Sequence, residues 1–168
     1  MSMELDQSTK AALFEYLTRL GDDRLIIGHR LSEWCGHGPE LEEDSAMSNM
    51  ALDFIGQAES FLKLASEVEG AGRSEEDLAY FRDEHEFRNL EMVEQPRGDF
   101  AVTMVRQFLF DTLAVNLLEA LKQSAYQPMA DIAAKSYKEA VYHLRHSREW
   151  VVRLGDGTDE SHQRTQNA

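Results

Sequence analysis

The chain carries polar side chains where the surrounding helical pattern requires apolar ones, and their types could bind metal. Asp111 falls on an apolar stripe, and His143 lies on the inward face of another helix, with Glu139 one turn before it. Asp53 flanks the stripe of a third helix, and Glu33 lies beside that of a fourth. Carboxylates and an imidazole facing the interior of a four-helix bundle are the ligand types of a di-iron carboxylate site.

The spacing of these residues does not meet the requirements of such a site. A di-iron site in a bundle takes a Glu from each of two helices and a Glu-x-x-His pair from each of the other two. Residues i and i+3 project side by side, so both groups of the pair reach the same metals. This sequence contains no Glu-x-x-His, since Ala140 precedes His143 by three residues and Gly56 follows Asp53 by three. The single Asp-x-x-His, at residues 159–162, is better explained as helix capping.

The sequence therefore predicts a vestigial polar cluster in the core, with no catalytic residue and no cofactor or metal bound by this chain. The cluster consists of Glu33, Asp53, Asp111, Glu139 and His143. Its members would satisfy one another through buried hydrogen bonds or ion pairs. The alternative is a bound di-iron centre, which would make the chain an independent di-iron oxidase or an iron-binding protein. A weaker alternative is a metal on His143 and His146, although His146 drifts off the core face.

Helical periodicity defines the elements that position these residues. Apolar residues recur at spacings of three, four and seven, and each of the three prolines stands where such a pattern stops or starts. Four long helices are expected at about 8–36, 41–68, 100–123 and 129–154. A short charged helix follows Ser74, with Leu78, Tyr80, Phe81 and Phe87 as its apolar anchors. Because the long helices are antiparallel, the fold class is an all-α four-helix bundle with additional short helices.

The length of 168 residues fits one domain. We expect that domain to span 1–168, with a lead-in at about 1–12 and the start of a further helix at 158–168. That last helix has barely begun when the sequence stops. The bundle is therefore expected to be truncated at its C-terminus.

The helix expected at 100–123 is apolar on two sides. Leu109, Leu113 and Leu117 lie on one side, and Asp111 lies on the other. A helix of this kind is either central in its own domain or pressed against a partner. The sequence leaves both possibilities open.

Charge and composition exclude several classes of function. A formal net charge of −14 argues against nucleic-acid binding, because backbone phosphates would repel the chain. No apolar run approaches the roughly 20 residues needed to span a membrane. We expect that the N-terminus is not a signal peptide, and that the single cysteine, Cys35, is a buried thiol rather than half of a disulfide. We expect a cytoplasmic protein with neither a nucleic-acid nor a membrane partner.

Long collinear segments carry a resemblance to a known family. They are Leu-Gly-Asp-Asp at 20–23, the stretch 30–42, residues 51–53 and 56–58, residues 93–96, 98–101, 105–108, 138–140, 142–145 and 153–158. Together these segments closely resemble the structural, non-catalytic (PaaC-type) subunit of bacterial phenylacetyl-CoA 1,2-epoxidase. The similarity covers nearly the whole chain after residue 12.

The resemblance implies a ferritin-like fold and a structural, scaffolding role in aerobic phenylacetate catabolism. In this family the PaaC-type subunit pairs with a paralogous catalytic subunit, which holds the di-iron centre and the substrate. The complex epoxidises the aromatic ring of phenylacetyl-CoA with O₂ and electrons from an NADPH-dependent reductase subunit. Hetero-oligomerisation and self-association are both expected. Family members usually continue through further helices where this chain ends. A helical adaptor outside phenylacetate metabolism is the other open class.

Overall fold

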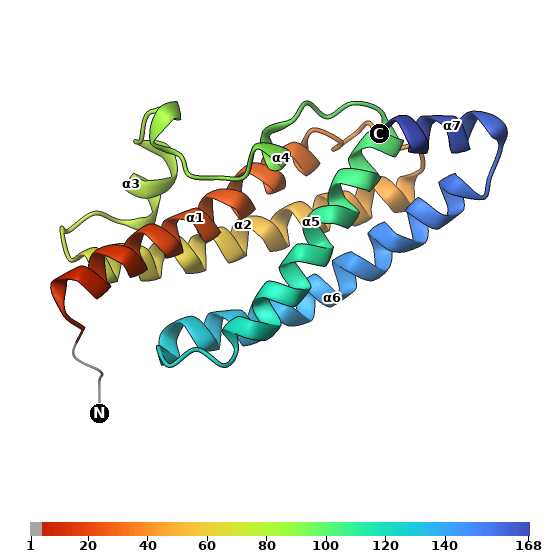
Figure 1. Cartoon of the computed structure of the whole chain (residues 1–168). Helices are drawn as coiled ribbons and strands as arrows, with labels where there is room; N and C mark the ends of the chain where they lie inside the picture. The colour runs from red at the N-terminus through yellow and green to blue at the C-terminus, as the bar shows by residue number, and fades with distance from the viewer. Residues whose placement is uncertain (1–4) are drawn as a thin grey trace.

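The computed structural model describes residues 5–168, which form an assembly of helices (Figure 1). The four long helices are α1 (Gln7–Ser32), α2 (Leu41–Glu69), α5 (Phe100–Leu121) and α6 (Gln127–Gly155). The short elements are α3 (Glu75–Tyr80), the 3₁₀ turn η1 (Glu84–Glu86), α4 (Glu91–Glu94) and α7 (Asp159–Asn167). Residues 5–168 contain no strand, so the predicted all-α class with additional short helices is confirmed.

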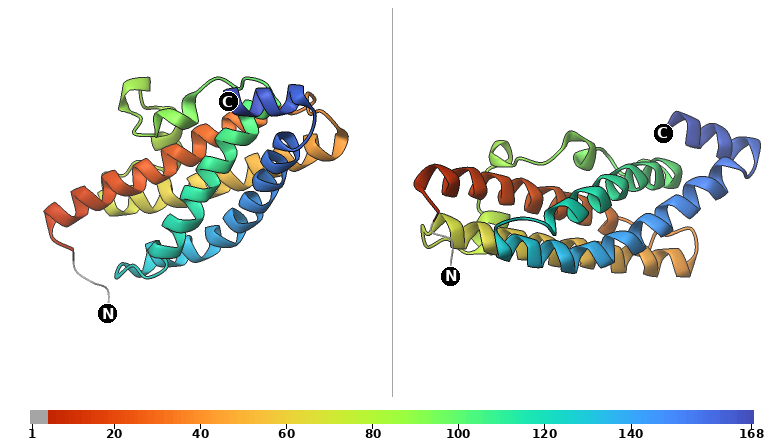
Figure 2. Two further views of the ribbon diagram at one scale, coloured as in Figure 1. Left: turned by 45° about the vertical axis from the view of Figure 1, so that its right-hand side comes forward. Right: turned by 60° about the horizontal axis from the view of Figure 1, so that its bottom comes forward.

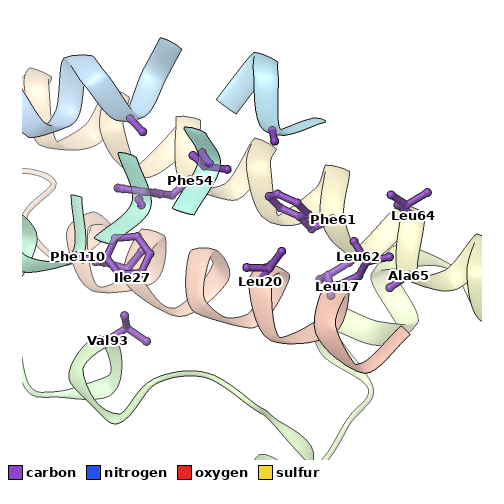
Figure 3. Close-up of a cluster of buried hydrophobic side chains, with 14 of the residues drawn as sticks. Leu17, Leu20, Ile27, Phe54, Phe61, Leu62, Leu64, Ala65, Val93 and Phe110 are labelled. Atoms are coloured by element: carbon purple, nitrogen blue, oxygen red, sulfur yellow. The ribbon is translucent and has the colours of Figure 1, made fainter. Parts of the chain in front are cut away.

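The long helices pack as two antiparallel hairpins. α1 lies along α2, α5 lies along α6, and α2 also contacts α6 (Figure 2). The main core lies among these four helices, and side chains such as Leu17, Phe54, Phe61 and Phe110 fill it (Figure 3). A smaller apolar cluster, built around Trp34, forms between the C-terminal end of α1 and the start of α5.

Glycine allows close approach along the α1–α2 seam. A Cβ atom on Gly21 would lie 2.6 Å from the side chain of Leu62, and one on Gly28 would lie 3.2 Å from the carbonyl oxygen of Ala51. The two glycines are seven residues apart, so they face the same side of α1. α1 is continuous through both of them, and they serve packing rather than helix termination.

The C-terminal end of α1 differs from the predicted bounds, whereas its start agrees to within one residue. The side chain of Asp6 accepts a hydrogen bond from the backbone of Thr9 at 2.8 Å, so the helix begins at Gln7. Residues 7–12 of the predicted lead-in are therefore helical, although they are exposed. Residues 1–4 lie outside the described part of the chain. At the other end the helix stops at Ser32, and Cys35, which was expected to be buried, is exposed in the turn that follows.

The connection between α2 and α5 is held against α1 by a buried ion pair that the sequence reasoning did not single out. The Asp22 carboxylate is fully buried and accepts hydrogen bonds from both terminal nitrogens of Arg82, one of them at 3.0 Å. It also accepts one from the backbone of Arg88 at 2.8 Å. The neighbouring Asp23 accepts one from the backbone of Leu90 at 2.7 Å. Asp22 and Asp23 together therefore fix residues 82–90.

The apolar anchors predicted for this connection are only partly correct. Leu78 in α3 is fully buried, as expected. Tyr80 and Phe81 are instead 61% and 80% exposed, because α3 ends at Tyr80 and the chain turns outward there. Phe87 lies under the guanidinium of Arg82 and is half-buried.

The further helix expected at 158–168 is present as α7. The side chain of Thr158 accepts a hydrogen bond from the backbone of Ser161 at 3.2 Å, which caps the helix. His162 Nδ1 lies 2.7 Å from the carbonyl oxygen of Gly155. The Asp-x-x-His at 159–162 is thus part of a helix start, as predicted.

We expected no apolar run of the length that spans a membrane, and α5 shows that this expectation was wrong. Among the described residues it is the one helix that passes the tests of length and mean hydropathy, and half of its apolar window is buried in the protein. It also carries the buried Arg106 and Asp111. Core helices pass the same tests, and α5 packs along α6 as a core helix does.

The outer side of α5 is open in this chain. Leu109 and Leu113 are 51% and 42% exposed, whereas Leu117 is half-buried and packs against the core. The two-sided pattern of the sequence therefore divides into an inner face, which carries Asp111, and an outer apolar face.

Candidate functional site

Four of the five predicted cluster residues lie among α2, α5 and α6. Asp53 comes from α2, Asp111 from α5, and Glu139 and His143 from α6. Glu33 does not join them, which corrects the predicted cluster. It follows the last residue of α1, where its carboxylate pairs with Arg30 at 2.5 Å and is partly exposed. The reason is that Glu33 lies beside the apolar stripe, at the exposed C-terminal end of α1, and does not face the interior.

His143 bridges the core to the surface through Asp53. Its ring is fully buried, lies 4.7 Å from the ring of Phe54, and places Nε2 3.0 Å from a carboxylate oxygen of Asp53. Burial lowers the pKa of His143, and the contact with Asp53 opposes that shift. A carboxylate can only accept, so Nε2 carries the proton in this hydrogen bond. The opposite nitrogen, Nδ1, is buried without a partner among the described residues.

Glu139 is paired through Gln57 with a buried arginine. The Gln57 side chain donates to Glu139 at 2.8 Å and accepts from Nε of Arg24 at 3.0 Å. Arg24 is almost fully buried and also donates to the carbonyl oxygen of Leu20 at 2.9 Å. Burial lowers the pKa of the Arg24 guanidinium to about 10. The sequence offered a signal for Arg24, since it stands between Leu20 and Ile27 on the apolar stripe of α1.

Asp111 is the buried acid with no cation beside it. Its carboxylate accepts from the Gln107 amide at 2.7 Å and from the Ser147 hydroxyl at 2.7 Å. Both donors are neutral, so they do not offset the loss of hydration. Burial raises the pKa of Asp111 to about 7, and the two hydrogen bonds oppose the shift.

Asp111, Glu139 and His143 therefore share the interior without bonding to one another. Asp111 accepts a hydrogen bond from Ser147 and Glu139 accepts one from Gln57, whereas His143 donates one to Asp53. The connection between Asp111 and His143 runs through α6, because Ser147 Oγ lies 3.1 Å from the carbonyl oxygen of His143. The structure therefore contains separate pairings in place of the predicted single cluster.

The residues present do not fit a di-iron centre. Among residues 5–168 no three side chains of His, Cys, Asp or Glu are grouped so that they could hold a metal ion. A ligand histidine would be needed three residues after Asp53, but that position is Gly56, which has no side chain to bind a metal. The space beside Gly56 is empty, since a Cβ atom added there would meet no atom within 4 Å. His143 and His146 do not share a site either, because His146 contacts Glu43 at 2.8 Å.

Because Gly56 has no side chain, a small open pocket lies between α2 and α6. It has a volume of about 220 Å³ and is lined by Asp53, Gly56, Gln57 and Glu139, among others. The Asp53 side chain is 41% exposed and connects this pocket to the buried ring of His143. The candidate site is thus a polar interior that is open to solvent at this pocket.

Comparison with known proteins gives a consistent assignment. The family described as "Phenylacetic acid catabolic protein" matches residues 2–168 of this chain. The chain is 51% identical over 156 residues to the C subunit of 1,2-phenylacetyl-CoA epoxidase from Escherichia coli (strain K12). That match covers 93% of this chain and 62% of the relative's length. The all-α architecture is consistent with the ferritin-like fold that the sequence resemblance implied. The chain belongs to the phenylacetic acid catabolic protein family.

Proposed function

We propose that this chain is a structural, scaffolding subunit of a multicomponent phenylacetyl-CoA epoxidase in the cytosol. In this proposal it pairs with a catalytic subunit that holds the di-iron centre and the substrate, and a separate NADPH-dependent reductase subunit supplies electrons. The observation that carries the proposal is that the polar side chains in the bundle interior form hydrogen bonds with one another. The 51% identity to the C subunit of such an epoxidase supports the choice of reaction.

Two of the candidate ligands in the interior already bind neighbouring side chains. Asp111 accepts from Gln107 and Ser147, and His143 contacts Asp53. A metal would have to displace these partners, and the sequence offers no Glu-x-x-His pair to hold it. The independent di-iron oxidase is disfavoured for this reason.

The outer face of α5 supports a role in assembly. Leu109 and Leu113 expose apolar surface that this chain leaves uncovered, and obligate interfaces are built from such surface. We expect this face to contact the catalytic subunit.

Iron analysis tests where the redox centre resides. The chain should be expressed with and without the catalytic subunit, and iron should be measured in each pure protein. We expect iron in the complex and none in this chain alone, and the variants Asp53→Ala and His143→Ala should leave the iron content of the complex unchanged. Stoichiometric iron in the isolated chain that disappears in His143→Ala would overturn the proposal.

A paired substitution tests the α5 face. The double variant Leu109→Asp/Leu113→Asp should lose association by at least about 100-fold, because two leucines together contribute on the order of 3 kcal/mol when buried. Leu117 is unsuitable because it packs against the core, so its replacement would test folding. Leu52→Asp is the matched control, since Leu52 is 67% exposed on α2. Helicity should be unchanged in both variants, and association that survives the double variant would remove α5 from the interface.

A further inference from the structure

The outward side of α6 carries an open hollow with a volume of about 450 Å³. Its apolar floor is made of Val141, Leu144 and Val152, and its basic residues are Arg145, Arg148 and Arg153. Glu149 also lines the hollow, and we call these seven residues the α6 groove. The floor is solvent-accessible, with Val141 44% and Val152 53% exposed.

The arginines of the α6 groove lack the carboxylate partners that three other exposed arginines have. Arg19, Arg73 and Arg164 each form an ion pair with a glutamate one turn away. In the described part of the chain no ion pair involves the three arginines of the groove, and two of them lie over aromatic rings instead. Arg145 stands 5.4 Å from the ring of Tyr142, and Arg153 stands 5.3 Å from the ring of Trp150.

This local charge is opposite to that of the whole chain. The protein has a formal net charge of −14, yet the groove gathers three arginines around one acid, Glu149. Such a patch attracts an anionic surface at short range. A nucleic acid or an anionic membrane would in addition meet the repulsion of the rest of the molecule, which a compact protein segment avoids.

The spacing of the groove indicates the shape of its occupant. Val141, Arg145, Arg148 and Val152 recur at i, i+4, i+7 and i+11, so they form one stripe along three helical turns. Such a stripe is about 16 Å long. Apolar residues flanked by charges at this spacing are what one helix presents to another.

We propose that the α6 groove binds an acidic amphipathic helix of the catalytic partner subunit. The apolar side of that helix lies on Val141, Leu144 and Val152, and its Asp or Glu side chains pair with Arg145, Arg148 and Arg153. This inference rests on the proposed function, which supplies the partner, and adds to it the docking surface and the chemistry of the docked segment.

Charge reversal tests the groove with the co-expressed partner subunit as the probe. Arg145→Glu/Arg148→Glu should weaken association by at least about 30-fold, because like charges then face each other across the contact. The matched control, Lys10→Glu/Lys63→Glu, alters total charge by the same amount at two exposed residues on α1 and α2. We expect the control and the conservative Arg145→Lys/Arg148→Lys to stay within about threefold of the unaltered chain.

A photoreactive side chain at Val152 identifies the occupant directly. We expect crosslinks to a partner peptide that is helical and rich in Asp and Glu. Equal binding by the reversed and control variants would overturn the proposal, as would crosslinks to a second copy of this chain. Binding of the isolated chain to phosphatidylglycerol vesicles that the reversal abolishes would also overturn it. If the unaltered chain binds no partner at all, the proposed function fails, which distinguishes the two failures.

Discussion

Asp22 and Asp111 are both fully buried aspartates, but their surroundings differ in charge. Asp22 forms an ion pair with the guanidinium of Arg82, whose side chain is only 7% exposed, and accepts a further hydrogen bond from a backbone amide. Asp111 accepts the same kind of short hydrogen bonds, yet only from the neutral side chains of Gln107 and Ser147.

The difference shows which buried acid stabilises the fold. Breaking a buried ion pair leaves an uncompensated charge, so Asp22 is required to hold residues 82–90 against α1. A buried carboxylate without a cation beside it opposes folding whenever it is ionised. Above neutral pH, Asp111 therefore lowers the free energy of unfolding rather than raising it. Substitutions at Asp22, Asp111 and Ser147 test this contrast, and we expect their effects on stability to decrease in that order.

Removing Asp22 should have the largest effect. Asp22→Ala leaves the buried Arg82 charge without a partner and removes the contacts that hold the connection between α2 and α5 against α1. We therefore expect the free energy of unfolding to fall by about 3–5 kcal/mol. Urea denaturation followed by circular dichroism measures the loss. Asp23→Ala, which removes a single hydrogen bond to the backbone of Leu90, serves as the neighbouring control and should cost about 1 kcal/mol. A loss at Asp22 no greater than that of the control would contradict the comparison.

Asp111 should make stability fall as pH rises. Its pKa is raised from 3.8 to about 7 by burial, so between these values the folded state keeps a proton that the unfolded state has released. The unfolded state therefore binds fewer protons, and the free energy of unfolding decreases with pH until both states are ionised above about 7. The total change from this group is at most about 4 kcal/mol.

Asp111→Asn isolates that contribution. We expect the variant to lose this pH dependence between pH 4 and 8, and to be more stable than the unaltered chain at pH 8. Urea titrations at several pH values measure the difference between the two proteins, in which the other titrating groups cancel. Parallel pH profiles for the two proteins would show that Asp111 does not titrate in this range.

Ser147→Ala should have the smallest effect. It removes one of the two donors to Asp111, so we expect a loss of about 1–2 kcal/mol at pH 8, where the carboxylate is charged, and less at pH 5. Ser136→Ala is the control, because Ser136 is a buried serine three turns earlier on the same helix. A loss at Ser147 that does not vary with pH would mean that the hydroxyl does not contact a titrating carboxylate.

Local sequence was enough to predict the four long helices and most of their inward faces. Apolar residues at spacings of three and four must lie on one side of a helix, and glycine and proline mark where each pattern stops. The absence of Glu-x-x-His could also be read directly, because that pair is local to one helix. Asp111 and His143 stood out for the same reason, as polar residues on apolar stripes.

The groups that these residues meet could be known only from the folded chain. The partner of Asp22 is Arg82, sixty residues away, and nothing in either local sequence specifies it. The pairing of His143 with Asp53 joins helices from different hairpins, and that of Asp111 with Ser147 joins the two helices of one hairpin, so both depend on how the helices are rotated and placed against each other. Periodicity gives the face on which a side chain lies, whereas the position of a neighbouring helix along its axis is set by packing of the whole core. For this reason the sequence indicated Asp111 and His143 as polar residues on inward faces, but neither the bonds that they form nor the exclusion of Glu33.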